Sequence, residues 1–142
     1  MTVKHVLSEK GGQVVTIAPA RSLAEAAQLL AQRRIGAVVV SEDGARVGGI
    51  LSERDIVRAV AREGAKALEA PVSAYMTRDV ITSVPETPMD DLMEIMTTGK
   101  FRHVPILVDG RLAGIVSIGD VVKHRLAAIE AETQALKEYI AG

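Results

Sequence analysis

Two short stretches of the sequence end an apolar run with Ser-x-x-Asp and then continue as a helix. The first stretch closes on Ser52 and Asp55, and the second on Ser117 and Asp120. A serine between a strand and a helix presents a hydroxyl and free backbone N–H groups, which together suit an anion. An aspartate three residues later lies on the same helix face, where its carboxylate can accept hydrogen bonds from two neighbouring ribose hydroxyls. The spacing therefore indicates two candidate sites for an anion and a ribose.

The same spacing also has a purely structural explanation. Ser-x-x-Asp resembles a capping box, in which the two side chains satisfy the first N–H groups of a helix and nothing is bound. A single copy would favour the cap. The second copy at a matched position strengthens the binding hypothesis, although two structural caps would give the same repetition.

The elements that position these junctions recur along the chain. Equivalent residues lie 66 positions apart, as in Thr16 and Thr82, and 65 apart after a one-residue deletion in the second hairpin, as in Asp55 and Asp120. Each copy predicts a strand, an amphipathic helix, two strands joined by an Asp-Gly turn, and a helix that starts at the junction. After a lead-in helix over 2–8, the first copy has strands over 14–17, 37–40 and 47–51 and helices over 23–30 and 53–62. The second has strands over 80–82, 104–108 and 112–116 and helices over 89–96 and 121–139.

This tandem pattern predicts a mixed α/β (α+β) fold of two β-α-β-β-α repeats. Neither copy can bury its sheet alone, so we expect the two sheets to pack on each other about a pseudo-twofold axis. The expected divisions are residues 1–65 for the first repeat with its lead-in helix, 66–126 for the second repeat, and 127–142 for a C-terminal helical extension.

Composition narrows the possible functions. A chain of 142 residues that is 48% hydrophobic and 25% charged can bury one hydrophobic core. Its net charge is -1, and the sequence contains no basic stripe that would bind nucleic acid. One Phe, two Tyr and no Trp leave few stacking platforms for single strands. The absence of cysteine excludes disulfides, thiolate metal sites and cysteine nucleophiles, and fits a reducing compartment.

The sequence also argues against a membrane protein, a metalloprotein and an enzyme. The longest apolar stretch, Ile35 to Val40, is too short to span a bilayer, and residues 1–12 contain no signal-peptide pattern. We therefore expect a soluble cytoplasmic protein. His5, His103 and His124 do not have the spacing of metal ligands. No nucleophile–base pair or phosphate-cradling glycine loop is present, so neither catalysis nor a catalytic cofactor is expected.

The duplicated unit resembles the CBS domain, named for cystathionine β-synthase, and the pair resembles a Bateman module. The resemblance rests on the junctions that end at Asp55 and Asp120 and on the segments Arg34–Val39 and Phe101–Ile106. It covers nearly the whole chain and is greatest to the stand-alone two-CBS proteins of bacteria. It implies a regulatory module that binds an adenosine-containing ligand (AMP, ADP, ATP, NAD or S-adenosylmethionine) between its repeats and signals to an unidentified protein target.

The resemblance further implies that each site is composite. Asp55 and Asp120 would bind ribose, with Ser52 and Ser117 beside the phosphate or the ribose. One site would join Asp120 to Val15 and to the backbone of Ile35, Gly36 and Ala37; the other would join Asp55 to Ile81, Phe101, Arg102 and His103.

The two sites are expected to differ in their affinity for phosphate. Arg102 is a permanent cation whose geometry matches phosphate oxygens, and an adjacent anion would favour the charged form of His103. The first repeat has Gly36 and Ala37 at these positions. We therefore expect the site with Asp55 to prefer ligands with more phosphate. The other site has only the helix start at Ser117 and Arg33 or Arg34 to compensate, and we expect it to bind phosphate poorly or to stay empty.

The competing hypothesis is a ligand-free interaction or oligomerisation module. The helix expected after Arg125 carries more large apolar residues than an isolated solvated tail should expose, and a homodimer would cover them. A tail that folds back on its own repeats is the alternative. The large apolar residues of this helix are Leu126, Ile129, Leu136, Tyr139 and Ile140.

Overall fold

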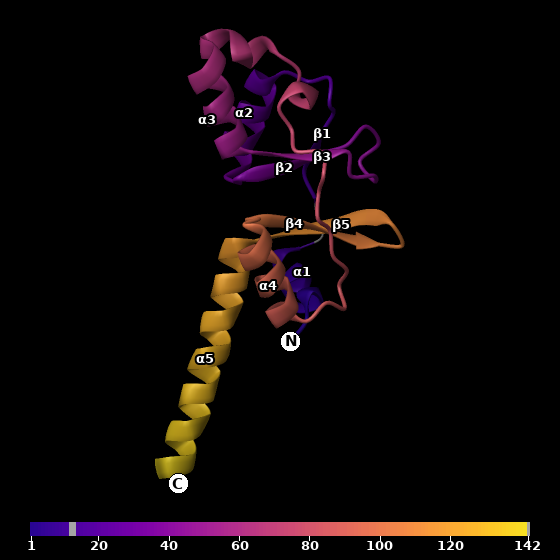
Figure 1. Ribbon diagram of the computed structural model, residues 1–142. Coiled ribbons are helices and arrows are strands. Elements are labelled where there is room, and N and C mark those ends of the chain that lie inside the picture. Colours follow the sequence, from indigo (N-terminus) through magenta and orange to yellow (C-terminus); the bar gives the residue numbers. More distant parts are fainter. Residues whose placement is uncertain (12–13, 142) are drawn as a thin grey trace.

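Two small sheets face each other across the middle of the molecule, and helices cover their outer faces (Figure 1). The computed structural model describes residues 1–11 and 14–141. The elements of the first half are α1 (Val3–Lys10), β1 (Thr16–Ile17), α2 (Leu23–Arg33), β2 (Ala37–Val40), β3 (Gly49–Ser52) and α3 (Glu53–Glu63). Two short 3-10 helices, η1 (Gly64–Glu69) and η2 (Val72–Ala74), lead to α4 (Met89–Gly99), β4 (His103–Val108), β5 (Arg111–Ser117) and α5 (Ile118–Ala141).

The sheet topology confirms the predicted mixed fold of two repeats. In the first sheet β1 pairs parallel to β2, and β2 pairs antiparallel to β3 through the Asp43-Gly44 hairpin. In the second sheet β4 pairs antiparallel to β5. All four residues of β2 are buried, as the unbroken apolar run predicts for a strand covered on both faces.

The predicted strand over 80–82 is wrong. Only Ser83 pairs with β4, as an isolated parallel bridge to Ile106 in which the Leu107 N–H donates to the Ser83 carbonyl at 2.8 Å. The next bond of a parallel ladder would need an N–H from residue 105, and Pro105 has none. The first repeat has Val39 at this position, and there β1 forms a regular parallel pair with β2.

The segment that precedes each repeat packs into the core of the other half. Val3 and Val6 of α1 are buried in one core with β4, β5 and α4, although α1 comes before the first repeat. Ala67 and Val72, which come before the second repeat, are buried in the other core with α2 and β2. The two sequence repeats therefore exchange covering segments, and a cut at residue 65 would separate each core from part of its cover.

The glycines of the two junction motifs allow this close covering. A Cβ at Gly49 would lie 2.6 Å from Met76 Sδ and 2.9 Å from the Thr77 carbonyl oxygen. A Cβ at Gly114 would collide with the side chain of Leu7 in α1. Glycine is needed at position 49 because the backbone of Thr77 crosses directly above the strand, whereas at Gly114 the close contact is with the end of the Leu7 side chain.

The last helix, α5, extends well beyond the two sheets (Figure 1). Val121 and His124 in its first turns are buried, and His124 Nε2 lies 3.1 Å from Glu9 Oε2 of α1. Its C-terminal half does not fold back on the module. Within residues 1–11 and 14–141, no helix combines the length and the apolar character needed to cross a membrane.

Candidate functional site

Both Ser-x-x-Asp junctions form the hydrogen bonds of a capping box. The Ser52 N–H and hydroxyl donate to Asp55 Oδ2 at 2.9 and 3.1 Å, and the Asp55 N–H donates back to Ser52 Oγ. The Ser117 N–H donates to Asp120 Oδ2 at 2.8 Å, and the Asp120 N–H donates back to Ser117 Oγ at 3.1 Å. In the described part of the chain these bonds use only Oδ2 of each carboxylate. Because a carboxylate can accept about four hydrogen bonds, the cap leaves Oδ1 free for a ligand.

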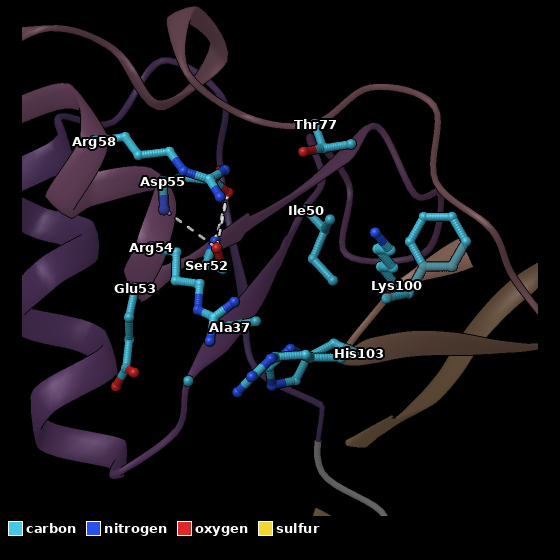
Figure 2. Close-up of a pocket in the computed structure, with 13 residues that line it drawn as sticks. Ala37, Ile50, Ser52, Glu53, Arg54, Asp55, Arg58, Thr77, Lys100 and His103 are labelled. Carbon is cyan, nitrogen blue, oxygen red and sulfur yellow. Dashed lines mark hydrogen bonds between the residues drawn. The ribbon is translucent and has the colours of Figure 1, made fainter. Parts of the chain in front are cut away.

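Asp55 lies beside a cavity of about 270 Å³ formed by both repeats, which we call the Asp55 cavity (Figure 2). Residues of β2, β3 and α3 form one side, and the end of α4 and the start of β4 form the other. The predicted residues that the structure brings together here are Ser52, Asp55, Phe101, Arg102 and His103, joined by Gly36 and Ala37.

The structure does not bring Ile81 to the Asp55 cavity. Ile81 is 43% exposed and lies in a shallow hollow with Ile95 of α4 and Phe101. The prediction assumed that residues 80–82 form an edge strand like β1. Because this segment does not pair with β4, its side chains are not aligned with the sheet face.

Basic side chains dominate the Asp55 cavity. Arg54, Arg58, Lys100 and Arg102 line it together with two carboxylates, Glu53 and Asp55, which leaves an excess of two positive charges. In Figure 2, Arg54 and Arg58 extend from α3 toward the cavity, while Lys100 and His103 enter from the other repeat. None of the four ion pairs among the described residues involves Arg102. The cavity can therefore attract an anionic ligand.

Three of these cations were missed in the sequence analysis. Arg54 and Arg58 are four residues apart and therefore lie on one face of α3, adjacent to Asp55. This spacing is a signal that the sequence analysis could have used. Lys100 directly precedes the Phe101 segment and sits at the left-handed end of α4, with φ of 59°.

Asp120 lies beside a second cavity of about 460 Å³, which we call the Asp120 cavity. It also joins the two repeats, because its wall comes from the segment before β1, from β2, and from β5 with the start of α5. All the residues predicted for this site line it: Val15, Ile35, Gly36, Ala37, Ser117 and Asp120.

Lys10, at the end of α1, binds the Asp120 carboxylate in this cavity. Its ammonium group donates to Asp120 Oδ2 and to the Ile115 carbonyl oxygen, each at 2.8 Å. Burial raises the pKa of Asp120, but the hydrogen bonds from Lys10 and from the Ser117 N–H outweigh it, so the pKa lies below its ordinary value of 3.8. The carboxylate is ionised at neutral pH, and the lysine is its partner. No local pattern in the sequence predicts this pair, which joins residues 110 positions apart.

His103 lies between the two cavities and lines both. A Cβ at Gly36 would be 3.5 Å from His103 Nε2, so the ring lies against the backbone of the opposite repeat. Burial lowers the pKa of His103 below 6.5, and the positive charge of Lys10 lowers it further. The imidazole is therefore mainly neutral at pH 7 in the unliganded protein, rather than a second cation beside Arg102.

Within residues 1–11 and 14–141, no three histidine, aspartate or glutamate side chains gather as metal ligands.

Comparison with known proteins identifies the fold. A sequence model of the CBS domain family matches residues 3–62 and 72–127. The chain belongs to the CBS domain family. It is 38% identical over 115 residues to an uncharacterized 17.7 kDa protein of Acidianus ambivalens, covering 80% of this chain and 68% of that protein. It is 31% identical over 115 residues to the CBS domain-containing protein YhcV of Bacillus subtilis, covering 81% of each.

Solved structures of CBS domain pairs share the arrangement. A CBS-domain protein of Agrobacterium tumefaciens is 53% identical and superposes with a TM-score of 0.84, covering 88% of this chain and 99% of that one. The Pyrobaculum aerophilum protein PAE2072, solved in complex with AMP, is 29% identical with a TM-score of 0.80, covering 94% and 99%. The CBS pair of protein MJ0100, solved with 5-methylthioadenosine and S-adenosyl-L-methionine, is 27% identical with a TM-score of 0.79, covering 90% and 98%.

Proposed function

We propose that this CBS pair is a regulatory module that binds adenosine-containing ligands in the Asp55 and Asp120 cavities and signals to a protein target through a change of conformation. One observation carries the proposal: each cavity joins a helix-start carboxylate of one repeat to backbone and apolar surface of the other. The complexes of PAE2072 with AMP and of MJ0100 with 5-methylthioadenosine and S-adenosyl-L-methionine support the ligand class.

We infer a role for each wall of the two cavities. The free Oδ1 of Asp55 or Asp120 would accept hydrogen bonds from the ribose hydroxyls. In the Asp120 cavity the adenine would lie against Val15 and the backbone of Gly36, and the phosphate would lie at the start of α5. In the Asp55 cavity the phosphates would meet Arg58 and Arg102, so ATP, ADP and NAD are candidates there alongside AMP.

A ligand in either cavity would contact both repeats at once. It would therefore favour the arrangement of the two halves that it fits best, and this difference in affinity is what can be transmitted to a partner. No catalytic step is part of the proposal. A cytoplasmic location, which the cysteine-free composition supports, is part of it.

A thermal-shift panel tests this function. The ligands are AMP, ADP, ATP, NAD and S-adenosylmethionine, with GTP as the control for base recognition. A ligand at 100 times its dissociation constant should add about 2.7 kcal/mol to the free energy of unfolding. The double variant Asp55→Asn/Asp120→Asn should lose most of the shift. If no adenosine ligand shifts the wild type, the chain is an interaction module without a nucleotide.

A further inference from the structure

The exposed face of α5 carries a regular apolar pattern, which we call the α5 seam. Its members are Val122, Leu126, Ile129, Thr133, Leu136 and Ile140, and the spacing between successive members alternates strictly between four and three residues. The five apolar members are between 44% and 75% exposed. A 4-3 alternation is the heptad pattern of a two-stranded coiled coil, in which these residues occupy positions a and d.

The α5 seam faces away from the module to which the helix is attached. In the heptad numbering, position a is occupied by Leu126, Thr133 and Ile140. Position d is occupied by Val122, Ile129 and Leu136. The two α5 residues that the module buries, Val121 and His124, fall at positions c and f, on the opposite side of the helix. A second helix can therefore reach the seam without displacing the packing of α5 on α1.

The charges beside the α5 seam select its partner. Arg125 and Glu132 are g residues, and Glu130 and Lys137 are e residues one heptad further along. In a parallel pair, g residues lie beside the e residues of the next heptad in the other helix. Glu132 would therefore meet the partner's Lys137. Arg125, which lies 3.9 Å from Asp90 of its own α4 in an exposed ion pair, would also meet the partner's Glu130. Twofold symmetry repeats both pairs, so a parallel second copy provides four complementary contacts.

The antiparallel arrangement puts like charges together. When position a of one helix lies opposite position d of the other in that arrangement, Lys123 faces the partner's Lys137. At the centre Glu130 faces the partner's Glu130, and Glu132 faces the partner's Glu132. The charge pattern thus disfavours an antiparallel pair as well as favouring the parallel one.

We propose that the α5 seam binds the α5 seam of a second copy of this chain as a parallel coiled coil. The predicted homodimer is thereby assigned a specific interface, which runs about 27 Å along the helix. Thr133, a polar residue at an a position in the middle of the seam, would help to hold the two helices in register. Both modules lie at the same end of the paired helices. The inference does not depend on nucleotide binding.

Light scattering on the full chain tests the interface. Wild type should have twice the 15.1 kDa mass of the chain at micromolar concentration. Leu136→Asp buries a charge in the seam and should return the mass to that of one chain. Ala131→Asp adds the same charge at the outer f position and should remain dimeric. A monomeric wild type, or a Leu136→Asp variant that stays dimeric, would overturn the proposal.

A charge reversal tests the pairing. Glu132→Lys should weaken the dimer by roughly three- to tenfold, because it replaces two exposed ion pairs with two repulsions. The double variant Glu132→Lys/Lys137→Glu should restore the wild-type affinity. If the double variant is no better than Glu132→Lys, the assigned pairs are wrong.

Cross-linking tests the orientation, and the absence of native cysteine makes it clean. Ile140→Cys should form a disulfide-linked dimer under mild oxidation, since position 140 faces its copy in a parallel pair. In an antiparallel pair the two residues would be about 27 Å apart and could not be bridged. Ala131→Cys on the outer face is the matched control and should stay monomeric on a non-reducing gel. Equal cross-linking of the two variants would refute the parallel seam.

Discussion

The two cavities use the same Ser-x-x-Asp junction but differ in the cations beside its carboxylate. At Asp55 two cations come from the same helix, as Arg54 and Arg58, and two come from the other repeat, as Lys100 and Arg102. Asp55 pairs with none of them within the described residues. At Asp120 one cation comes from α1, as Lys10, which is bound directly to the carboxylate. Arg34, the equivalent of Lys100 at an offset of 66, also lines this cavity. Duplication has therefore kept the geometry that can hold a ribose, while the surrounding charges have diverged.

The repeat offsets show where this divergence lies. The offset of 65 that relates Asp55 to Asp120 relates Arg54 to Gly119. The offset of 66 that relates Thr16 to Thr82 relates Lys10 to Met76, which cannot form an ion pair. A ligand of the Asp120 cavity therefore meets a carboxylate that already binds a lysine through Oδ2, whereas a phosphate in the Asp55 cavity meets cations that form no ion pair among the described residues.

The largest effect is expected from removing the charge of Asp55. Asp55→Asn should weaken nucleotide binding in the Asp55 cavity by tenfold or more, because each hydrogen bond to a charged group contributes about 1.5 to 3 kcal/mol. The amide oxygen can still accept the Ser52 N–H, so the melting temperature should barely move. Calorimetric titration measures both cavities. Asp109→Asn, on the exposed β4–β5 turn, is the control. Unchanged titrations with a large loss of stability would leave Asp55 as a helix cap only.

The difference in phosphate preference should give the next largest effect. Arg58→Ala and Arg102→Ala should each weaken AMP and ATP by roughly three- to tenfold in the Asp55 cavity and leave adenosine nearly unchanged, because only the phosphates contact these side chains. Asp120→Ala should leave this phosphate-dependent site intact. Arg111→Ala, on the distant hairpin, controls for the loss of surface charge. Equal losses for adenosine, AMP and ATP, or one uniform class of sites in wild type, would remove the distinction between the cavities.

Removing Lys10 should have a smaller effect, which differs in size between two ligands. Lys10→Met places at position 10 the residue found at the equivalent position in the other repeat, Met76. Adenosine should bind the Asp120 cavity about two- to fivefold more tightly, since it no longer competes with the ammonium group. AMP should gain less, because its phosphate loses a nearby cation.

The control for Lys10 is Lys4→Met, on an exposed turn of the same helix. The side chains of Lys10 and Asp120 are 36% and 22% exposed, so loss of the pair should cost at most about 1 kcal/mol of unfolding free energy. Weaker adenosine binding in Lys10→Met would show that the lysine supports the ligand and does not compete with it.

Most of the fold could be predicted from the sequence because its duplication is local and regular. The repeat pattern predicted every α-helix and all strands except one, and the apolar run of β2 indicated its burial. The exception depends on a partner strand. Residues 80–82 have the composition of a strand, but a ladder needs donors from β4, and Pro105 removes one of them.

The candidate sites were predictable only where one junction motif determines them. The capping geometry of Ser52 with Asp55 follows from a spacing of three, and the composite cavities follow from the family resemblance. The contact of Lys10 with Asp120 has no local signal. It depends on α1 crossing to the second core, where Val3 and Val6 are buried. Side chains brought together by such an exchange cannot be paired from a single sequence.

The smallest expected effect concerns His103, which belongs to both cavities. Its pKa lies below 6.5 in the folded protein because of burial and of Lys10, so the unfolded chain takes up the proton first on acidification. The contribution of His103 to stability is therefore complete above pH 6.5 and is lost as the pH falls through the native pKa. Urea unfolding at pH 7.5 and 5.5 should show a smaller loss of stability in His103→Gln than in wild type, and the difference between the two losses should be well under about 1.4 kcal/mol.

The ligand then connects this titration to the difference between the cavities. A phosphate beside Arg102 would favour the charged imidazole and raise the pKa of His103, whereas adenosine, with no phosphate, would not. An NMR titration of the His103 ring should thus give a pKa below 6.5 without ligand, an increase with AMP, and no increase with adenosine. His5, on α1, is the internal control. An equal shift with both ligands would mean that the phosphate does not lie near His103, and the cations of the Asp55 cavity would then have to act without it.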